Sequence, residues 1–177
     1  MIKPLLKAAT FDKPGANWLV AGIVVLVAVT FSYAGFQFLS ASAAGARIYL
    51  QPAKSTAALG STFVVDVRGD ALGETVNAAQ VNVTYPANKL RYDGYDAQGG
   101  VLEVQANAEN TPGTVRIARG TVTSTTGDFK ILSLRFSVIG TGKADLSVDP
   151  TSALVRQSDA TDILTSYGSA RFKLSRK

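Results

Sequence analysis

Apolar and polar residues alternate along most of the chain after residue 46, which is the period of a β-strand with one buried face. The clearest run sets Leu132, Leu134, Phe136 and Val138 against Ser133, Arg135 and Ser137. Nine segments follow the pattern: RIYLQP, STFVVDVRG, AAQVNVTYP, KLRYDG, GVLEVQANA, TVRIARG, FKILSLRFSVIG, KADLSVDP and SARFKL. We therefore predict about nine strands.

Turn residues separate these segments. They include LG at 59–60, GD at 69–70, YPAN at 85–88, DG at 93–94, TPG at 111–113, TGD at 126–128 and GTG at 140–142. Gly, Pro, Asn and Asp each favour a reversal of the backbone. No stretch between the strands has the period of a helix, so the crossovers that a parallel sheet needs are missing. The sequence predicts an all-β fold, a sandwich or barrel of antiparallel strands.

The segment from Trp18 to Leu39 has a different pattern, because its 22 residues carry no charge. As a helix it is about 33 Å long, enough to cross the hydrocarbon core of a membrane. Three lysines and one aspartate precede it. By the positive-inside rule, this end stays in the cytoplasm and the rest of the chain is exported.

These features divide the chain into four regions. We expect a cytoplasmic N-terminus at 1–17, a transmembrane helix at 18–39, a small-residue linker at 40–46 and an exported domain at 47–177. Ala41-Ser42-Ala43 and Ala44-Gly45-Ala46 match small-x-small cleavage sites. The apolar run is longer than the roughly 7–15 residues of a signal-peptide core, which favours an uncleaved signal anchor over a cleaved one. The expected location is the cell membrane, crossed once, with the domain outside the cell.

Composition restricts the chemistry of the exported domain. The chain has no cysteine and no histidine, which excludes disulfides, Ser-His-Asp and Cys-His catalysis, and zinc sites of the usual nitrogen and sulfur ligands. Glutamate is scarce in this domain, with Glu74, Glu103 and Glu109 only, and none has an acid–base context. We predict a protein that is not an enzyme.

The charge of the exported domain is low. Three of the 18 basic residues and one of the 13 acidic residues precede Arg47, which leaves 15 basic against 12 acidic residues after that point. No long basic face occurs, so no nucleic-acid partner is expected.

Five segments of the exported domain follow a known family pattern in order and spacing. They are ALGSTFVVDVRG (58–69), VNAAQVNVTYPANKLRYDGYDAQGG (76–100), GTVRIARG (113–120), GDFKILSLRFSVIGTGKADLSV (127–148) and ALVRQSDATDI (153–163). Residues 47–175 resemble a cohesin module, in the superfamily shared with some carbohydrate-binding modules. The chain has Tyr85-Pro86-Ala87 where that family often has Tyr-Asp-Pro, so the acidic turn residue is missing.

The resemblance implies a jelly-roll β-sandwich of about nine strands and a binding function, toward a dockerin partner, through one sheet face. That face maps onto the outward residues of two strands. They are Gln80, Asn82 and Thr84 on the first and Arg116 and Ala118 on the second. The simpler interpretation is that these residues are only the wet half of an alternating sheet.

Two further kinds of site can be sought from residue types. Exposed aromatic rings can stack on sugars, and Tyr95 and Tyr167 lie among Gly, Asp and Ser residues. No cofactor is required, but calcium accepts carboxylate and carbonyl ligands. The candidate calcium ligands are Asp93 and Asp96 in YDGYDAQGG, and Asp159 and Asp162 in SDATD. Paired acids in an exposed turn are also common without a metal.

Three functions remain open at this stage. The first is adhesion or scaffolding through a protein partner, dockerin-like or another surface protein. The second is binding of an extracellular polysaccharide by a carbohydrate-binding surface module. The third is a pilin-like filament subunit. SASAAGARIYLQP breaks the helix directly after the apolar run, which counts against the third function.

Overall fold

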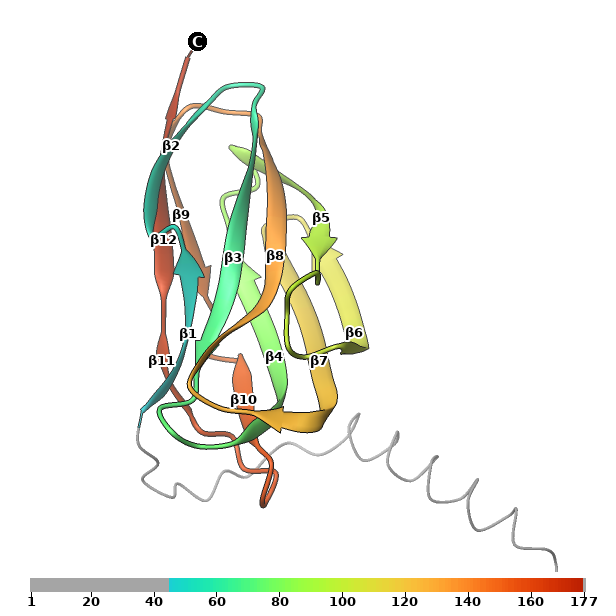
Figure 1. Ribbon diagram of the computed structural model, residues 1–177. Coiled ribbons are helices and arrows are strands. Elements are labelled where there is room, and N and C mark those ends of the chain that lie inside the picture. Colours follow the sequence, from blue (N-terminus) through green and yellow to red (C-terminus); the bar gives the residue numbers. More distant parts are fainter. Residues whose placement is uncertain (1–44, 177) are drawn as a thin grey trace, which may run out of the picture. The chain divides into compact units, whose positions relative to one another are not determined.

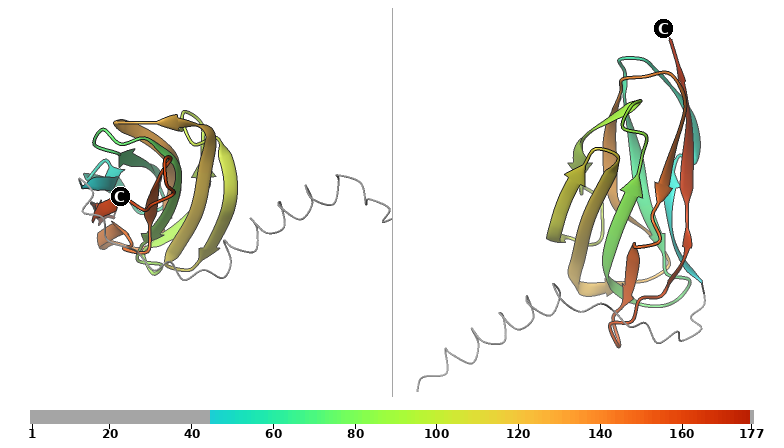
Figure 2. Two further views of the ribbon diagram at one scale, coloured as in Figure 1. Left: turned by 90° about the horizontal axis from the view of Figure 1, so that it is seen from below. Right: turned by 180° about the vertical axis from the view of Figure 1, so that it is seen from behind.

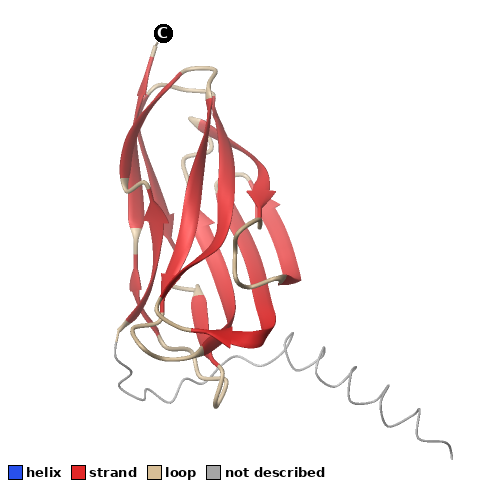
Figure 3. Ribbon diagram, in the orientation of Figure 1, coloured by secondary structure: helices blue, strands red, loops and turns tan. Residues whose placement is uncertain are grey.

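The computed structural model describes residues 45–176, and these form a β-sandwich (Figure 1). The strands are β1 (Ala46–Gln51), β2 (Lys54–Ala58), β3 (Thr62–Asp70), β4 (Val76–Thr84), β5 (Leu90–Asp96), β6 (Val104–Thr111), β7 (Thr114–Thr125), β8 (Asp128–Val138), β9 (Gly142–Val148), β10 (Ala153–Arg156), β11 (Leu164–Tyr167) and β12 (Ser169–Ser175). Figure 3 shows that the regular structure of these residues is all strand. The predicted all-β sandwich is confirmed.

Two sheets face each other across the interior (Figure 2). The five-stranded sheet has the order β11-β1-β3-β8-β5. The seven-stranded sheet has the order β2-β12-β9-β4-β7-β6, with β10 paired to β4 beside β9. Most pairs are antiparallel, and the exceptions are β1 with β11 and β12 with β2.

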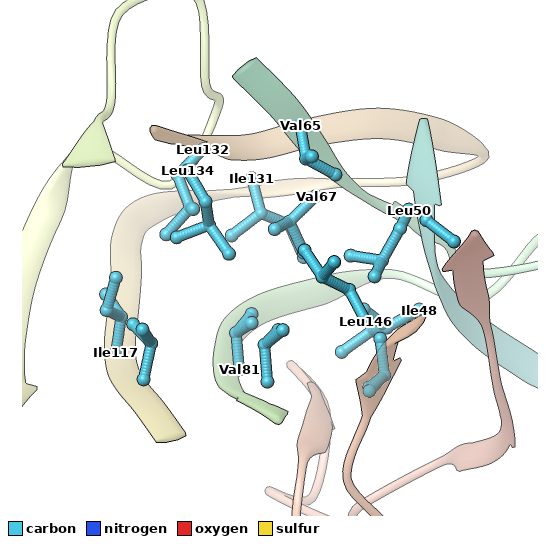
Figure 4. Packing of buried hydrophobic residues seen from close by; sticks show 14 of the residues in the cluster. Ile48, Leu50, Val65, Val67, Val81, Ile117, Ile131, Leu132, Leu134 and Leu146 are labelled. Atoms are coloured by element: carbon cyan, nitrogen blue, oxygen red, sulfur yellow. The ribbon is translucent and has the colours of Figure 1, made fainter. Parts of the chain in front are cut away.

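Alternation places one side of each central strand in the core. Val65 and Val67 of β3, Leu134 of β8, Ile117 of β7 and Leu146 of β9 are almost fully buried. Figure 4 shows these side chains directed from the two sheets toward a shared interior. Without a disulfide in the described residues, burial of these apolar surfaces is the main source of stability.

The two long edges of the sandwich differ. At one edge the chain passes directly from one sheet to the other, between β1 and β2 and again between β11 and β12. Gly168 lies at the second crossing, where a Cβ atom would stand 2.7 Å from Tyr49 Cα. At the other edge β5 and β6 end their respective sheets and do not pair with each other (Figure 1). This edge is open.

The structure corrects the number of strands from about nine to twelve. The three additional strands, β2, β10 and β11, have only four or five residues each. Strands β2 and β11 lie at sheet edges, and β10 pairs with only the first half of β4. Their sequences are therefore too short to show extended alternation.

The predicted cytoplasmic N-terminus at 1–17 and the predicted transmembrane segment at 18–39 lie outside the described residues, as does the linker up to residue 44. Among residues 45–176 there is no helix long and apolar enough to span a membrane.

Candidate functional site

Small side chains meet across the outer face of the seven-stranded sheet. Ala79, Val81 and Val83 of β4 point into the core, so their even-numbered neighbours point outward. Cross-strand pairing sets Ala78 opposite Gly120 and Gln80 opposite Ala118 on β7. We call these four residues, Ala78, Gln80, Ala118 and Gly120, the platform. Because three of them have at most one side-chain carbon, the platform is low and flat.

Strand β6 continues this face to the open edge. All eight of its residues are exposed. Asn107 pairs with Ala118 and Glu109 pairs with Arg116, so Asn107 and Glu109 share the outer side with the platform. Neither residue was predicted as part of a site, although the alternation in TVRIARG points to this side of β7.

Asn82 does not face solvent, contrary to the prediction from alternation. The turn Asp149–Ser152, which joins β9 to β10, lies against Asn82 and bonds to both its backbone and its side chain. The Asn82 side-chain nitrogen donates to the carbonyl oxygen of Thr151 at 3.0 Å and to its hydroxyl at 2.7 Å. The Asn82 backbone nitrogen donates to the Ser152 hydroxyl at 3.0 Å. Asn82 is therefore 1% exposed, and its side-chain oxygen is buried with no hydrogen-bond partner.

The other predicted residues of this face keep their outward positions. Gln80 is half-buried, and its side-chain nitrogen also donates to the Thr151 carbonyl, at 3.2 Å. Thr84 is half-buried and donates to the carbonyl of Ser147 at 3.4 Å. Arg116 is exposed. The face thus combines a flat centre with a polar margin.

Charges of both signs border the platform. The Thr151 hydroxyl and backbone N–H donate to Asp149 at 2.6 and 2.9 Å. These bonds, together with the charge of Arg116, hold the pKa of Asp149 below its usual value. Asp149 is therefore a carboxylate at neutral pH, and Arg116 lies between it and Glu109.

A bulge in β5 turns two tyrosines to the same side. Tyr92 pairs with Phe136 and Tyr95 pairs with Leu134, but Asp93 is an extra residue between them and Gly94 has a φ of +133°. Regular alternation would send Tyr92 and Tyr95 to opposite faces. Both instead pack against the core at the open edge. Burial raises the pKa of Tyr92 to about 12.

These tyrosines line a cleft between β5 and β6. Its volume is about 320 Å³, and its walls include both rings, Ala108, Asn110 and the core residue Ile117. The Tyr95 hydroxyl donates to the side-chain oxygen of Gln105 on β6. This bond joins the two sheets across the open edge. We call this space the edge cleft.

Tyr167 lies far from Tyr95 in the fold. It belongs to β11, which is the opposite edge strand of the five-stranded sheet from β5. Its hydroxyl donates to the carbonyl of Leu164 at 3.5 Å. The two tyrosines predicted as sugar-binding residues therefore do not form one aromatic surface.

The first pair of candidate calcium ligands lies on β5. The hydroxyl of Ser137 and the guanidinium of Arg91 both donate to Asp93, and they hold the pKa of Asp93 below its usual value. Asp96 accepts the backbone N–H of Gln98 at 2.8 Å. Both acids border a second, smaller cleft of about 140 Å³ on the outer face of the five-stranded sheet, beside Arg135.

The second pair shapes the turn between β10 and β11. Arg156 donates to both oxygens of Asp159 and holds the pKa of that carboxyl well below its usual value. Asp162 accepts the backbone N–H groups of Leu154 and Leu164 at 2.9 and 3.0 Å. Within residues 45–176, no three acidic side chains are grouped to hold a metal ion. The calcium hypothesis gains no support from this arrangement.

The chain matches the model of one protein family, the cohesin domain, over residues 48–171. No curated protein sequence matches it.

Solved structures with this fold are distant in sequence. The solution structure of CaCohA2 from Clostridium acetobutylicum has a TM-score of 0.64 and 16% identity, over 75% of this chain and 92% of that one. A non-cellulosomal cohesin from the archaeon Archaeoglobus fulgidus has a TM-score of 0.60 and 17% identity, over 74% and 91%. The third ScaB cohesin of Ruminococcus flavefaciens, in complex with a group 1 dockerin, has a TM-score of 0.56 and 14% identity, over 74% and 96%.

Proposed function

The chain belongs to the cohesin domain family, and from this premise we propose that residues 45–176 form a non-catalytic module that binds a protein partner on the outer face of β10, β4, β7 and β6. The partner is a dockerin-like module or another surface protein. One of the similar structures is a cohesin in complex with a dockerin, which supports a protein ligand over other ligand classes.

The observation that carries this proposal is the pairing of small residues on the platform. Ala78 opposite Gly120 and Ala118 opposite Gln80 leave one side chain longer than a methyl group on the platform, that of Gln80. A helix or a second sheet can therefore approach the backbone closely and bury a continuous area. Interfaces of this kind have a flat, dry centre and a polar rim.

The margin of the platform supplies that rim. Arg116 and Glu109 face each other across β6 and β7, and Asp149 lies beside Arg116. Exposed charges of both signs at a rim add specificity and speed of association more than affinity. A partner with a matching pair of opposite charges fits this margin.

The location proposed for the module is outside the cell, held to the membrane by an uncleaved signal anchor at 18–39. The support is the charge-free length of that segment and the lysines before it. Protease added to intact cells should digest the module and leave a short protected N-terminal fragment. Recovery of the full-length chain in the cytosolic fraction would overturn this location.

Site-specific crosslinking tests the binding face. We propose to place a photo-crosslinking residue at Ala118, on the platform, or at Val64, which is exposed on the outer face of the other sheet. In cells of the source organism, position 118 should crosslink a protein that position 64 does not. The crosslinked protein is then purified and its affinity for the full-length chain measured by calorimetry.

Two matched substitutions complete the test. Ala118→Lys should abolish binding of the purified partner because a long cation then stands on the flat centre, whereas Val64→Lys should leave the affinity unchanged. Equal crosslinking at both positions, or a partner that binds the Ala118→Lys protein as tightly as the original, would reject the proposed face.

A further inference from the structure

The edge cleft is a recessed surface that is separate from the platform. At the open edge β5 and β6 do not pair with each other. Besides the loop 97–103 that connects them, the hydrogen bond from Tyr95 to Gln105 bridges them. The space between them, about 320 Å³, falls within the range of roughly 300–1,000 Å³ for small-molecule clefts.

The residues around the edge cleft combine aromatic rings with an uncharged polar group. Tyr92 and Tyr95 provide two rings on the β5 side. Asn110 pairs with the buried Val115, so its amide lies on the inner side of β6, facing the cleft. Glu109 borders the cleft as part of β6, but its carboxylate accepts a hydrogen bond from Asn107 on the outer side at 3.1 Å. The cleft therefore offers apolar ring surface, hydrogen-bond donors and acceptors in a small volume.

We propose that the edge cleft binds a saccharide. A pyranose has apolar C–H faces, which pack on aromatic rings, and hydroxyl groups at its edge, which need both donors and acceptors. The side-chain amide of Asn110 supplies one donor group and one acceptor. A small cation would use the rings and the amide oxygen but would leave the amide donor of Asn110 without a role.

The fixed position of the Tyr92 ring supports a ligand site at the edge cleft. Its ring packs at a centroid distance of 5.8 Å from Phe136, which fixes the position of the ring against the core. The bulge at Asp93 is what brings Tyr95 beside it. Bulges re-aim side chains at functional sites in many sheets. Here the bulge creates the paired aromatic wall of the cleft.

This site is independent of the proposed protein-binding face. Asn110 and Asn107 lie on the same exposed strand, but Asn110 is on the inner side and Asn107 is on the outer side with the platform. Substituting each to Ala removes the same amide from either side of β6. The pair therefore separates cleft binding from platform binding.

Calorimetric titration of the full-length chain tests the proposal. The probes are the soluble tetrasaccharides of cellulose, xylan, chitin and mannan, and the protein is kept in lauryldimethylamine oxide, a detergent whose head group is not a sugar. At least one probe should bind with a dissociation constant in the micromolar to low millimolar range. Asn110→Ala should weaken binding about three- to tenfold, which corresponds to one lost hydrogen bond, and Asn107→Ala should leave it unchanged.

A second variant addresses the aromatic wall. Tyr95→Ala should abolish measurable binding if circular dichroism shows the sandwich intact, and where it unfolds the protein the asparagine pair alone decides. Failure of all four probes to bind would overturn the proposal, as would equal affinities of the Asn110→Ala and Asn107→Ala proteins. Neither result bears on the platform, because that surface is tested with a protein partner.

Discussion

The side-chain amide of Asn82 donates to the carbonyl oxygen of Thr151 at 3.0 Å, and this contact fixes the turn between β9 and β10 against β4. Strand β4 changes partner at this point. Val83 pairs with Val148 of β9, whereas Gln80 pairs with Ala153 of β10. Asn82 thus bonds the turn at the place where the sheet would otherwise lack a neighbouring strand.

We expect Asn82→Ala to destabilise the sandwich by about 1–3 kcal/mol, because two hydrogen bonds to Thr151 are lost and the turn is left without its anchor. Urea unfolding of the full-length protein measures the change. Gln80→Ala is the control, since it removes a single, more exposed bond to the same carbonyl. A Gln80→Ala protein as unstable as the Asn82→Ala protein would contradict the anchoring role.

Arg119 has a comparable role at the start of β6. It is 6% exposed, and it donates to the backbone carbonyls of Leu102 and Glu103 at 2.7 and 2.8 Å. These bonds hold the loop between β5 and β6 and keep Leu102 in the core. The planar guanidinium reaches both carbonyls at once, which a lysine cannot do.

Arg119→Met should therefore destabilise the protein by about 2–4 kcal/mol, because two poorly hydrated carbonyls lose their donors. Arg119→Lys should lie between Arg119→Met and the original protein. Thermal unfolding of the three proteins measures the order. A more stable Arg119→Met protein would mean that the cost of burying the charge exceeds the value of the two bonds.

The sequence predicts the central strands well because their alternation is long. The segment 132–138 and the residues of β3 and β4 lie with their apolar sides inward, as the period of two requires. The same rule fails for Asn82, because alternation indicates only which side of a sheet a residue is on. It does not reveal that a distant turn covers that side.

The candidate site depends on two features that local sequence does not determine. The bulge at Asp93 reverses the side on which Tyr95 lies, and its position follows from pairing with β8 rather than from β5 itself. Gly94 in YDGYD is the only local sign of this bulge. To predict that Asn110 lines a cleft, one must know that β5 and β6 are both edge strands, which is a property of the topology.

Gly100 should tolerate no side chain. A Cβ atom at this position would stand 2.3 Å from the carbonyl oxygen of Ile131 on β8. We expect Gly100→Ala to cost about 2 kcal/mol or more, because the loop and β8 must separate. Gly60→Ala is the control: Gly60 has a φ of +81° and no atom near the new carbon, so its cost should be about 1 kcal/mol from backbone strain alone. Chemical denaturation of both variants gives the comparison, and equal losses would contradict the steric account.

The pKa of Tyr92 makes stability depend on pH in the alkaline range. Burial, and then the neighbouring Tyr95 and Tyr85, raise its pKa to about 12 from an ordinary value near 10. In the unfolded chain the phenol loses its proton near pH 10, whereas the folded protein keeps it. Ionisation then favours the unfolded chain, so the contribution is complete below pH 10 and is lost as the pH rises toward 12.

The expected loss between pH 9 and pH 11 is roughly 1 kcal/mol for this residue, because the ring is only partly buried and water screens part of the effect. Tyr92→Phe has no proton to release and keeps the packing on Phe136, so its stability should fall less over the same interval. Urea unfolding of both proteins at the two pH values measures the difference. Parallel losses in the two proteins would show that Tyr92 titrates alike in the folded and unfolded chains, and that the wall of the edge cleft is open to water.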